Sequence, residues 1–436
     1  MKTVKTAAAI LGSIFLGSAA QAAKTVLLAE TVSAAVETHL TVKLAKADTE
    51  AAKARAIEAA ASLLPSVIAG ASQKRTFEEN LAAQGLSGGP VPAMIGPFDT
   101  FDARVRLTQT LFDYSLIKRA QAAGRGRDLA ARLEEVAREQ VAVAAELSYV
   151  EAVRAFKAVE AAQADSDLAG RLLEQAHEQE RQGTATGVDV VRARARASVA
   201  AAALLHAQVG ERNALIRLKR VAGWPLGEDV SVTADLAPGS EALLPVDVSI
   251  ARAQGARPEI AAADEQVRID ALTITATRAE RGPSLAANAD IGLSGNLPDS
   301  SARRTSAIGV GLSIPIFTGR LIGGRVEAAK AEKAGSTARA ADIRAQVEED
   351  VRLAYENISE AREQVRADMQ SRELADQELR MAEDQYAAGT GDNVAVVAAQ
   401  SALAQARDAV VDSLAHEADA RINLAAALGA AKDFKL

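Results

Sequence analysis

Residues 308–331 read IGVGLSIPIFTGRLIGGRVEAAKA, and this stretch places a strand, a proline and the start of a long helix in succession. Apolar residues alternate with small ones from Ile308 onward, which is the two-residue period of a strand with one apolar face. After Pro315 the sequence changes to good helix formers that continue to Ala387 without another proline. The stretch therefore predicts a strand that leads directly into an unusually long helix.

The same arrangement occurs earlier in the chain. The matching pairs, which stand 218, 205 and 206 residues apart, are Pro65 and Pro283, Phe112 and Phe317, and Gly183 and Gly389. A self-similar period of this length indicates an internal duplication.

Two stretches without proline, 98–224 and 316–436, leave room for long helices. We expect helices from about 116 to 181 and from about 325 to 387, each ~90 to 100 Å long at 1.5 Å per residue. Return helices are predicted after Gly187 and Gly391, with apolar residues at coiled-coil steps, so that each long helix and its return helix form an antiparallel hairpin. Shorter helices are predicted at 32–62 and 258–279. The Gly-rich segment 322–325 lacks a phosphate-loop pattern and is interpreted as the sharp junction between strand and helix.

Four segments alternate with a period of two, near 65–75, 100–112, 283–295 and 304–317. An ordinary half-buried sheet shows the same alternation. Strand lengths near ten and aromatic residues at strand ends favour transmembrane strands, with Val105, Ile291 and Val310 toward lipid and Thr108 and Asn288 on the other face. Four strands cannot close a barrel, so several chains must contribute.

The first 22 residues have the features of a secretory signal peptide, with two lysines, an apolar stretch and an Ala20-Gln21-Ala22 cleavage pattern. The chain has no cysteine, which excludes disulfides and a thiol nucleophile. Loss of Lys2 and Lys5 would lower the formal net charge from −7 to −9, which argues against nucleic acid as a partner. No run of eighteen apolar residues follows, so no membrane-spanning helix is expected.

Catalytic chemistry finds little support in the sequence. The four histidines, His39, His177, His206 and His416, show neither an HExxH motif nor the spacing of a catalytic triad. A metal at His177 or His416 is less favoured than a solvated helix-face histidine. We therefore expect a protein that is not an enzyme and that has no cofactor, no metal and no catalytic residue.

The duplicated order of helix, two strands, long helix, glycine turn and return helix resembles the outer membrane efflux protein family, the trimeric channel-tunnels of tripartite efflux and type I secretion systems. The more specific stretches are 308–331 and QYAAGTGDNVAVVAAQSALAQARDAVVDS at 385–413. The resemblance implies a mostly α protein with a β-barrel part, in which long coiled-coil hairpins join four transmembrane strands per chain and a homotrimer closes a twelve-stranded barrel. It places the protein in the outer membrane, with its helices in the periplasm.

The resemblance also implies a division of the chain. After the signal peptide at 1–22, we expect a first repeat at 23–222, an equatorial linker at 223–257, a second repeat at 258–429 and a tail at 430–436. Trp224 in the linker is expected to serve in packing.

The implied function is that of a passive exit duct working with outer membrane lipid, a periplasmic adaptor and an inner membrane transporter of the RND, ABC or MFS type. The family's adaptor-docking positions fall on Gly183, Thr184, Gly389 and Thr390. Its periplasmic gate falls on Asp189, Tyr386, Gly391 and Asp392. The family arginine of the gate is replaced by Gly391, and its inner acidic pair by Ala395 and Ala398. Asp189 is therefore expected to have no obvious cationic partner at the closed mouth. The alternative is a periplasmic coiled-coil scaffold without channel activity.

Overall fold

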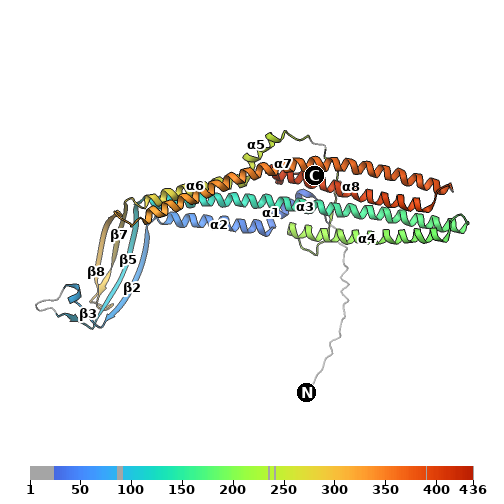
Figure 1. The fold of residues 1–436 in the computed structure, drawn as a ribbon. Coiled ribbons are helices and arrows are strands. Elements are labelled where there is room, and N and C mark those ends of the chain that lie inside the picture. The colour runs from blue at the N-terminus through green and yellow to red at the C-terminus, as the bar shows by residue number, and fades with distance from the viewer. Residues whose placement is uncertain (1–23, 86–91, 234–235, 240–241, 389, 436) are drawn as a thin grey trace, which may run out of the picture.

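The computed structural model describes residues 24–85, 92–233, 236–239, 242–388 and 390–435. Over these residues the chain is elongated, with a four-stranded sheet at one end and long paired helices that run from it to the other end (Figure 1). The predicted signal peptide lies outside the described residues.

The sheet contains two strands from each half of the duplicated sequence. In sheet order they are β2 (Ser66–Thr76), β5 (Phe98–Asp113), β7 (Ser284–Gly295) and β8 (Arg303–Ser313), and all neighbours are antiparallel. The central pair, β5 and β7, joins the two halves. Among the described residues, the outer edges of β2 and β8 pair with no strand. A small hairpin of β3 (Glu79–Asn80) and β4 (Met94–Ile95) lies between β2 and β5 in the chain. The prediction of four long strands is confirmed.

The strand register produces one apolar face and one polar face. Val105 and Ile291 are directly opposite each other, and Val310 lies on the same face through its pairing with Ala287. These three side chains are 42%, 43% and 64% exposed. Thr108 and Asn288 are opposite each other on the other face. The alternation read from the sequence therefore matches the observed register.

The junction between sheet and helix differs from the prediction. Strand β8 ends at Ser313 rather than near 317, because Pro315 has no N–H to donate to a neighbouring strand. The chain then turns at Gly319 and Arg320, which both have positive φ, 59° and 67°. The sharp turn thus precedes the segment 322–325, whose glycines lie inside the following helix. The prediction that 322–325 forms the junction is wrong.

The helices make up most of the chain. They are α1 (Leu28–Thr38), α2 (Leu40–Ala61), α3 (Tyr114–Arg181), α4 (Gly187–Ala222), α5 (Val246–Ala256), α6 (Pro258–Ala279), α7 (Leu321–Ala387) and α8 (Asn393–Ala427). At 68 and 67 residues, α3 and α7 each span ~100 Å. They form antiparallel hairpins with α4 and α8, and near the sheet they pack with α2 and α6 (Figure 1). The prediction of long helical hairpins is confirmed.

The first predicted helix, 32–62, is two helices. The backbone of His39 is extended, with φ −63° and ψ 140°, and separates α1 from α2. Its ring Nδ1 accepts a hydrogen bond from the Thr41 N–H at 3.3 Å and so caps α2. At this break Thr38 Oγ1 donates to the carbonyl of Ala222 at the end of α4, at 2.9 Å. The break therefore lies where α1 meets the end of the first hairpin.

The predicted equatorial linker, 223–257, has secondary structure of its own. Strand β6 (Val230–Val232) pairs in parallel with β1 (Lys24–Val26), and α5 packs on α7. Trp224 packs against the core cluster that contains Tyr149, as expected for a packing role. Further along, the buried carboxylate of Glu417 accepts the Gly239 N–H at 2.9 Å. These contacts bind the linker to both hairpins.

One helix in the described part of the chain, α8, is long and apolar enough to span a membrane by length and composition. No such helix was expected from the sequence, because no uninterrupted run of eighteen apolar residues occurs in it after residue 22. One third of the apolar window of α8 is buried inside the chain. The buried side of α8, including Val396, Leu403 and Val410, packs against its neighbours in the hairpin.

Candidate functional site

The candidate site consists of the two hairpin turns, which lie at the end of the helices farthest from the sheet (Figure 1). Apolar residues of α3, such as Leu168 and Leu172, pack against the core between α7 and α8 close to these turns. The two hairpins are therefore held together near their ends.

The first turn closes the C-terminus of α3. Gly183 has φ +78°, and its N–H donates to the carbonyl of Glu180 at 3.0 Å. Thr184 donates to the carbonyl of Gln179 through both its N–H, at 2.9 Å, and its Oγ1, at 3.1 Å. Among the residues that the structure describes, no atom outside the turn lies within 4 Å of the place a Cβ on Gly183 would occupy. Backbone conformation therefore requires this glycine, and the space in front of it is free.

The second turn repeats this geometry 206 residues later. Thr390 donates to the carbonyl of Gln385 through its N–H at 3.0 Å and its Oγ1 at 3.2 Å. The N–H of Gly391 donates to the same carbonyl at 3.0 Å, and a Cβ on this glycine would lie 3.0 Å from the Cβ of Gln385. Gly389, the predicted counterpart of Gly183, lies outside the described residues. The two threonines thus have the same role in ending their helices.

The two acidic residues predicted for the gate begin the return helices. Asp189 Oδ2 accepts hydrogen bonds from the N–H and the Oγ1 of Thr186, at 3.0 and 2.7 Å. These two bonds lower the pKa of the Asp189 carboxyl, with a smaller contribution from Arg192. Asp392 accepts hydrogen bonds from the N–H groups of Val394 and Ala395, which caps α8.

Asp189 has a cationic neighbour within its own helix. Arg192 Nη1 lies 3.6 Å from Asp189 Oδ1, one helical turn along α4. The sequence contained this signal, because residues three apart on a helix are neighbours. The ion pair is local to one helix and does not link two hairpins.

Tyr386 lies where the two hairpins meet. Its hydroxyl is 3.5 Å from Nδ2 of Asn393, the first residue of α8. Both residues line a small space between the hairpins together with Arg196 and Glu383. Burial, followed by the charge of Asp384, raises the pKa of the Glu383 carboxyl. Asn393, Arg196 and Glu383 were not predicted, because their proximity depends on how the hairpins pack.

The positions of the inner acidic pair are occupied by alanines. The side chains of Ala395 and Ala398 are exposed on α8.

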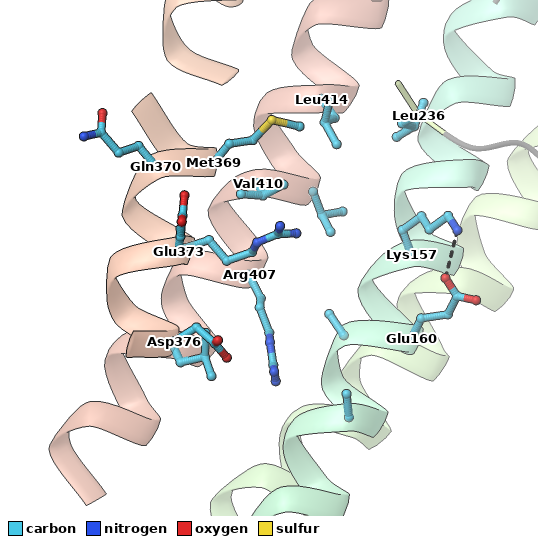
Figure 2. A pocket seen from close by; sticks show the side chains of 15 residues that line it. Lys157, Glu160, Leu236, Met369, Gln370, Glu373, Asp376, Arg407, Val410 and Leu414 are labelled. Atoms are coloured by element: carbon cyan, nitrogen blue, oxygen red, sulfur yellow. Dashed lines mark ion pairs between the residues drawn. The ribbon is translucent and has the colours of Figure 1, made fainter. Parts of the chain in front are cut away.

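A larger hollow of about 840 Å³ lies between the hairpins, farther from the turns. Figure 2 shows Lys157 and Glu160 of α3 on one side of it, with Glu373 of α7 and Arg407 of α8 on the other. Arg407 forms an ion pair with Asp165 at 2.5 Å. Cations and carboxylates are balanced around the hollow, so the charges select no ligand.

The histidines remain scattered. His177 Nδ1 is 3.9 Å from Glu180, and His416 Nε2 is 3.4 Å from Glu360. In the parts of the chain that the structure describes, no group of three His, Cys, Asp or Glu side chains could hold a metal ion.

Part of the chain matches a known protein family. Residues 249–430 match the protein family described as outer membrane efflux protein. No curated protein matches the sequence.

Solved structures match nearly the whole chain. The outer membrane protein VceC of Vibrio cholerae has a TM-score of 0.78 at 20% identity, with 92% of this chain and 96% of VceC covered. The CmeC outer membrane channel of Campylobacter jejuni has a TM-score of 0.79 at 19% identity, with 93% and 86% covered. The MtrE outer membrane channel of Neisseria gonorrhoeae, in its open state, has a TM-score of 0.74 at 18% identity, with 92% and 88% covered. The fold is that of outer membrane channels.

Proposed function

We infer that this chain, which belongs to the outer membrane efflux proteins by its residues 249–430 and shares their fold over nearly its whole length, is a passive exit duct of the outer membrane. It is a channel and not an enzyme. Its sheet lies in the membrane and its helices extend into the periplasm.

One observation carries this inference, namely the exposed apolar face of a sheet with two free edges. On β8, Ile308, Val310 and Leu312 are 87%, 64% and 64% exposed. In water this face would need a cover, whereas in a bilayer it contacts lipid. Hydrocarbon does not tolerate unpaired strand edges, so β8 of one chain must pair with β2 of the next until a ring closes. Two chains would give eight strands and three would give twelve, and the likeness to trimeric channels supports three.

The helices support the same assembly. Along α4, apolar side chains remain exposed in the single chain, and they include Val191, Val199 and Leu205 at 63%, 58% and 63%. Helix α4 packs mainly on α3, so its outer side is free to contact a neighbouring chain. We propose a homotrimer in which three pairs of hairpins enclose a tunnel.

For the turns we propose adaptor docking at Gly183, Thr184, Gly389 and Thr390. The free space in front of Gly183 supports this role, because a bare backbone allows close approach of a partner. The adaptor would connect the duct to an inner membrane transporter of the RND, ABC or MFS type. The cargo would then be either a small molecule in efflux or a protein in type I secretion.

We also propose that Asp189, Tyr386, Gly391 and Asp392 lie at a periplasmic gate. The caps that Asp189 and Asp392 form fix the first turns of the return helices, and Tyr386 is close to α8 through Asn393. These contacts lie within one chain. Closure between chains would therefore depend on packing of the hairpins more than on an arginine bridge at Gly391.

The experiment is single-channel recording from purified protein in planar lipid bilayers. A duct requires detergent in solution and gives discrete conductance steps after insertion. A periplasmic scaffold would remain soluble without detergent and would give none.

A further inference from the structure

The polar face of the sheet carries an excess of positive charge. Register places six ionisable side chains on this face, namely Lys74, Asp102, Arg104, Arg106, Asp290 and Arg303. Four cations and two carboxylates give +2 per chain on this face, although the whole chain has a formal net charge of −7. The sign of this face is therefore opposite to that of the protein.

Both carboxylates are engaged by one arginine. Arg104 Nε donates to Asp102 Oδ1 at 2.7 Å, and Arg104 Nη1 donates across the strands to Asp290 Oδ1 at 3.0 Å. Gly292 is directly opposite Arg104, and a Cβ there would lie 2.4 Å from the Arg104 Cβ. Because Gly292 has no side chain, Arg104 has space to lie beside β7. Arg106 is directly opposite Asp290 in the register, but within the described residues the ion pair of Asp290 is with Arg104.

Arg106 is the most central of these remaining cations. It is exposed, and within the described residues it forms no ion pair and no hydrogen bond through its side chain. Together with Asp102, Arg104 and Thr108 it borders a hollow of about 270 Å³ on the polar face, where Asp102 is paired with Arg104. Its guanidinium is thus available to solutes that pass along the sheet.

We propose that Arg106 forms an anion-attracting belt inside the barrel and favours anionic over cationic solutes at the exit. This rests on the proposed function, since the polar face must enclose the lumen. In a closed ring of three chains, the three copies of Arg106 lie at the same level along the barrel axis. The net charge of the three polar faces together is then +6. Rings of arginine or lysine select anions in pores, and walls of one charge sign raise the local concentration of counter-ions.

The test measures the local potential with thiol reagents of opposite charge. Because the chain has no cysteine, Thr108→Cys places a single thiol on the polar face two residues from Arg106. Anionic sulfonatoethyl and cationic trimethylammonium-ethyl methanethiosulfonate are added from the outer side of protein in lipid vesicles. Entry from this side does not depend on the periplasmic mouth. The ratio of their labelling rates is compared with the ratio for free cysteine.

We expect the thiol of Thr108→Cys to favour the anionic reagent more than free cysteine does. Adding Arg106→Gln should bring the ratio to the free-cysteine value, Arg106→Glu should reverse the preference, and Arg106→Lys should retain it. The matched control is Arg75→Gln, which removes one arginine from the opposite face of the same sheet. It should leave the ratio unchanged.

Two failures are distinguishable. If Thr108→Cys is labelled without charge preference, or if Arg106→Gln leaves the ratio unchanged, the belt is refuted and the duct stands. If Val105→Cys on the apolar face is labelled in vesicles as readily as Thr108→Cys, that face is not in lipid. The proposed function then fails as well.

Discussion

Glu146 is a carboxyl group that the fold holds in its neutral form. It lies in α3 with no exposed surface, and neither side-chain oxygen has a hydrogen-bond partner within the described residues. Burial raises its pKa from 4.5 to about 8, with a further contribution from the charge of Glu139. The folded protein therefore binds a proton at Glu146 under conditions in which the unfolded chain releases it.

The effect on stability follows from linkage. Because the pKa is raised on folding, the stability is fully present below the unfolded pKa of 4.5 and is lost as pH rises toward about 8. At 1.36 kcal/mol per pKa unit, the loss over this window is ~5 kcal/mol as an upper limit. Glu146→Gln removes the ionisation and keeps the shape. We expect it to unfold at a higher temperature than the parent near pH ~8 and at a similar temperature near pH ~5.

The assay is thermal unfolding in detergent at both pH values, followed by circular dichroism. The matched control is Glu135→Gln in the same helix, because Glu135 has a 47% exposed side chain in a surface ion pair with Arg132. This control should leave the pH dependence unchanged. If Glu146→Gln unfolds with the same pH dependence as the parent, Glu146 does not titrate as a buried acid and the reasoning is refuted.

Three further predictions concern the membrane face, the docking turns and the gate. Arginine in place of Val105, Ile291 or Val310 should destabilise the inserted protein by ~2 to 4 kcal/mol near the bilayer midplane and reduce membrane assembly. Variants with arginine in place of Thr108 or Asn288 should assemble normally and change only the conductance. Equal loss of assembly for both faces would contradict the assignment of the lipid face. Gly389→Trp, and more weakly Gly183→Trp, should abolish transport in export assays while the trimer remains in the membrane. Gly183→Ala is the control, because it has the same backbone strain as Gly183→Trp without the bulky side chain. Normal export by both Trp variants would refute the docking proposal. Gly391→Arg should lower the single-channel conductance, because an ion pair with Asp189 would stabilise the closed state by ~0.2 to 1 kcal/mol, and adding Asp189→Ala should restore the conductance. Gly391→Ala controls for crowding against Gln385. An arginine variant that conducts like the parent would refute the proposed gate.

The sequence was sufficient for the architecture because its signals are periodic and local. The alternation in β5, β7 and β8 identified strands with one apolar face, and proline-free runs identified α3 and α7 as long helices. The glycine at 183 was identified from its place after a helix, and its φ of +78° agrees with that reading. These features depend on backbone chemistry within a few residues.

The sequence was insufficient where packing between distant segments decides the structure. The pairing of β1 with β6 and the capture of Gly239 by Glu417 join residues far apart in the chain. The proximity of Tyr386 to Arg196 depends on how two hairpins pack together. His39 divides a predicted helix into α1, which packs on α3 and α4, and α2, which continues along α3 toward the sheet. The Arg104 network required the register of β5 against β7, which alternation alone does not determine.

The central claim is that the free edges of β2 and β8 close a barrel between chains. Native mass spectrometry of the mature protein released from detergent counts the chains directly. We expect a single species of three chains. A monomer that is stable without detergent would contradict it, because four strands with two free edges cannot remain in a bilayer.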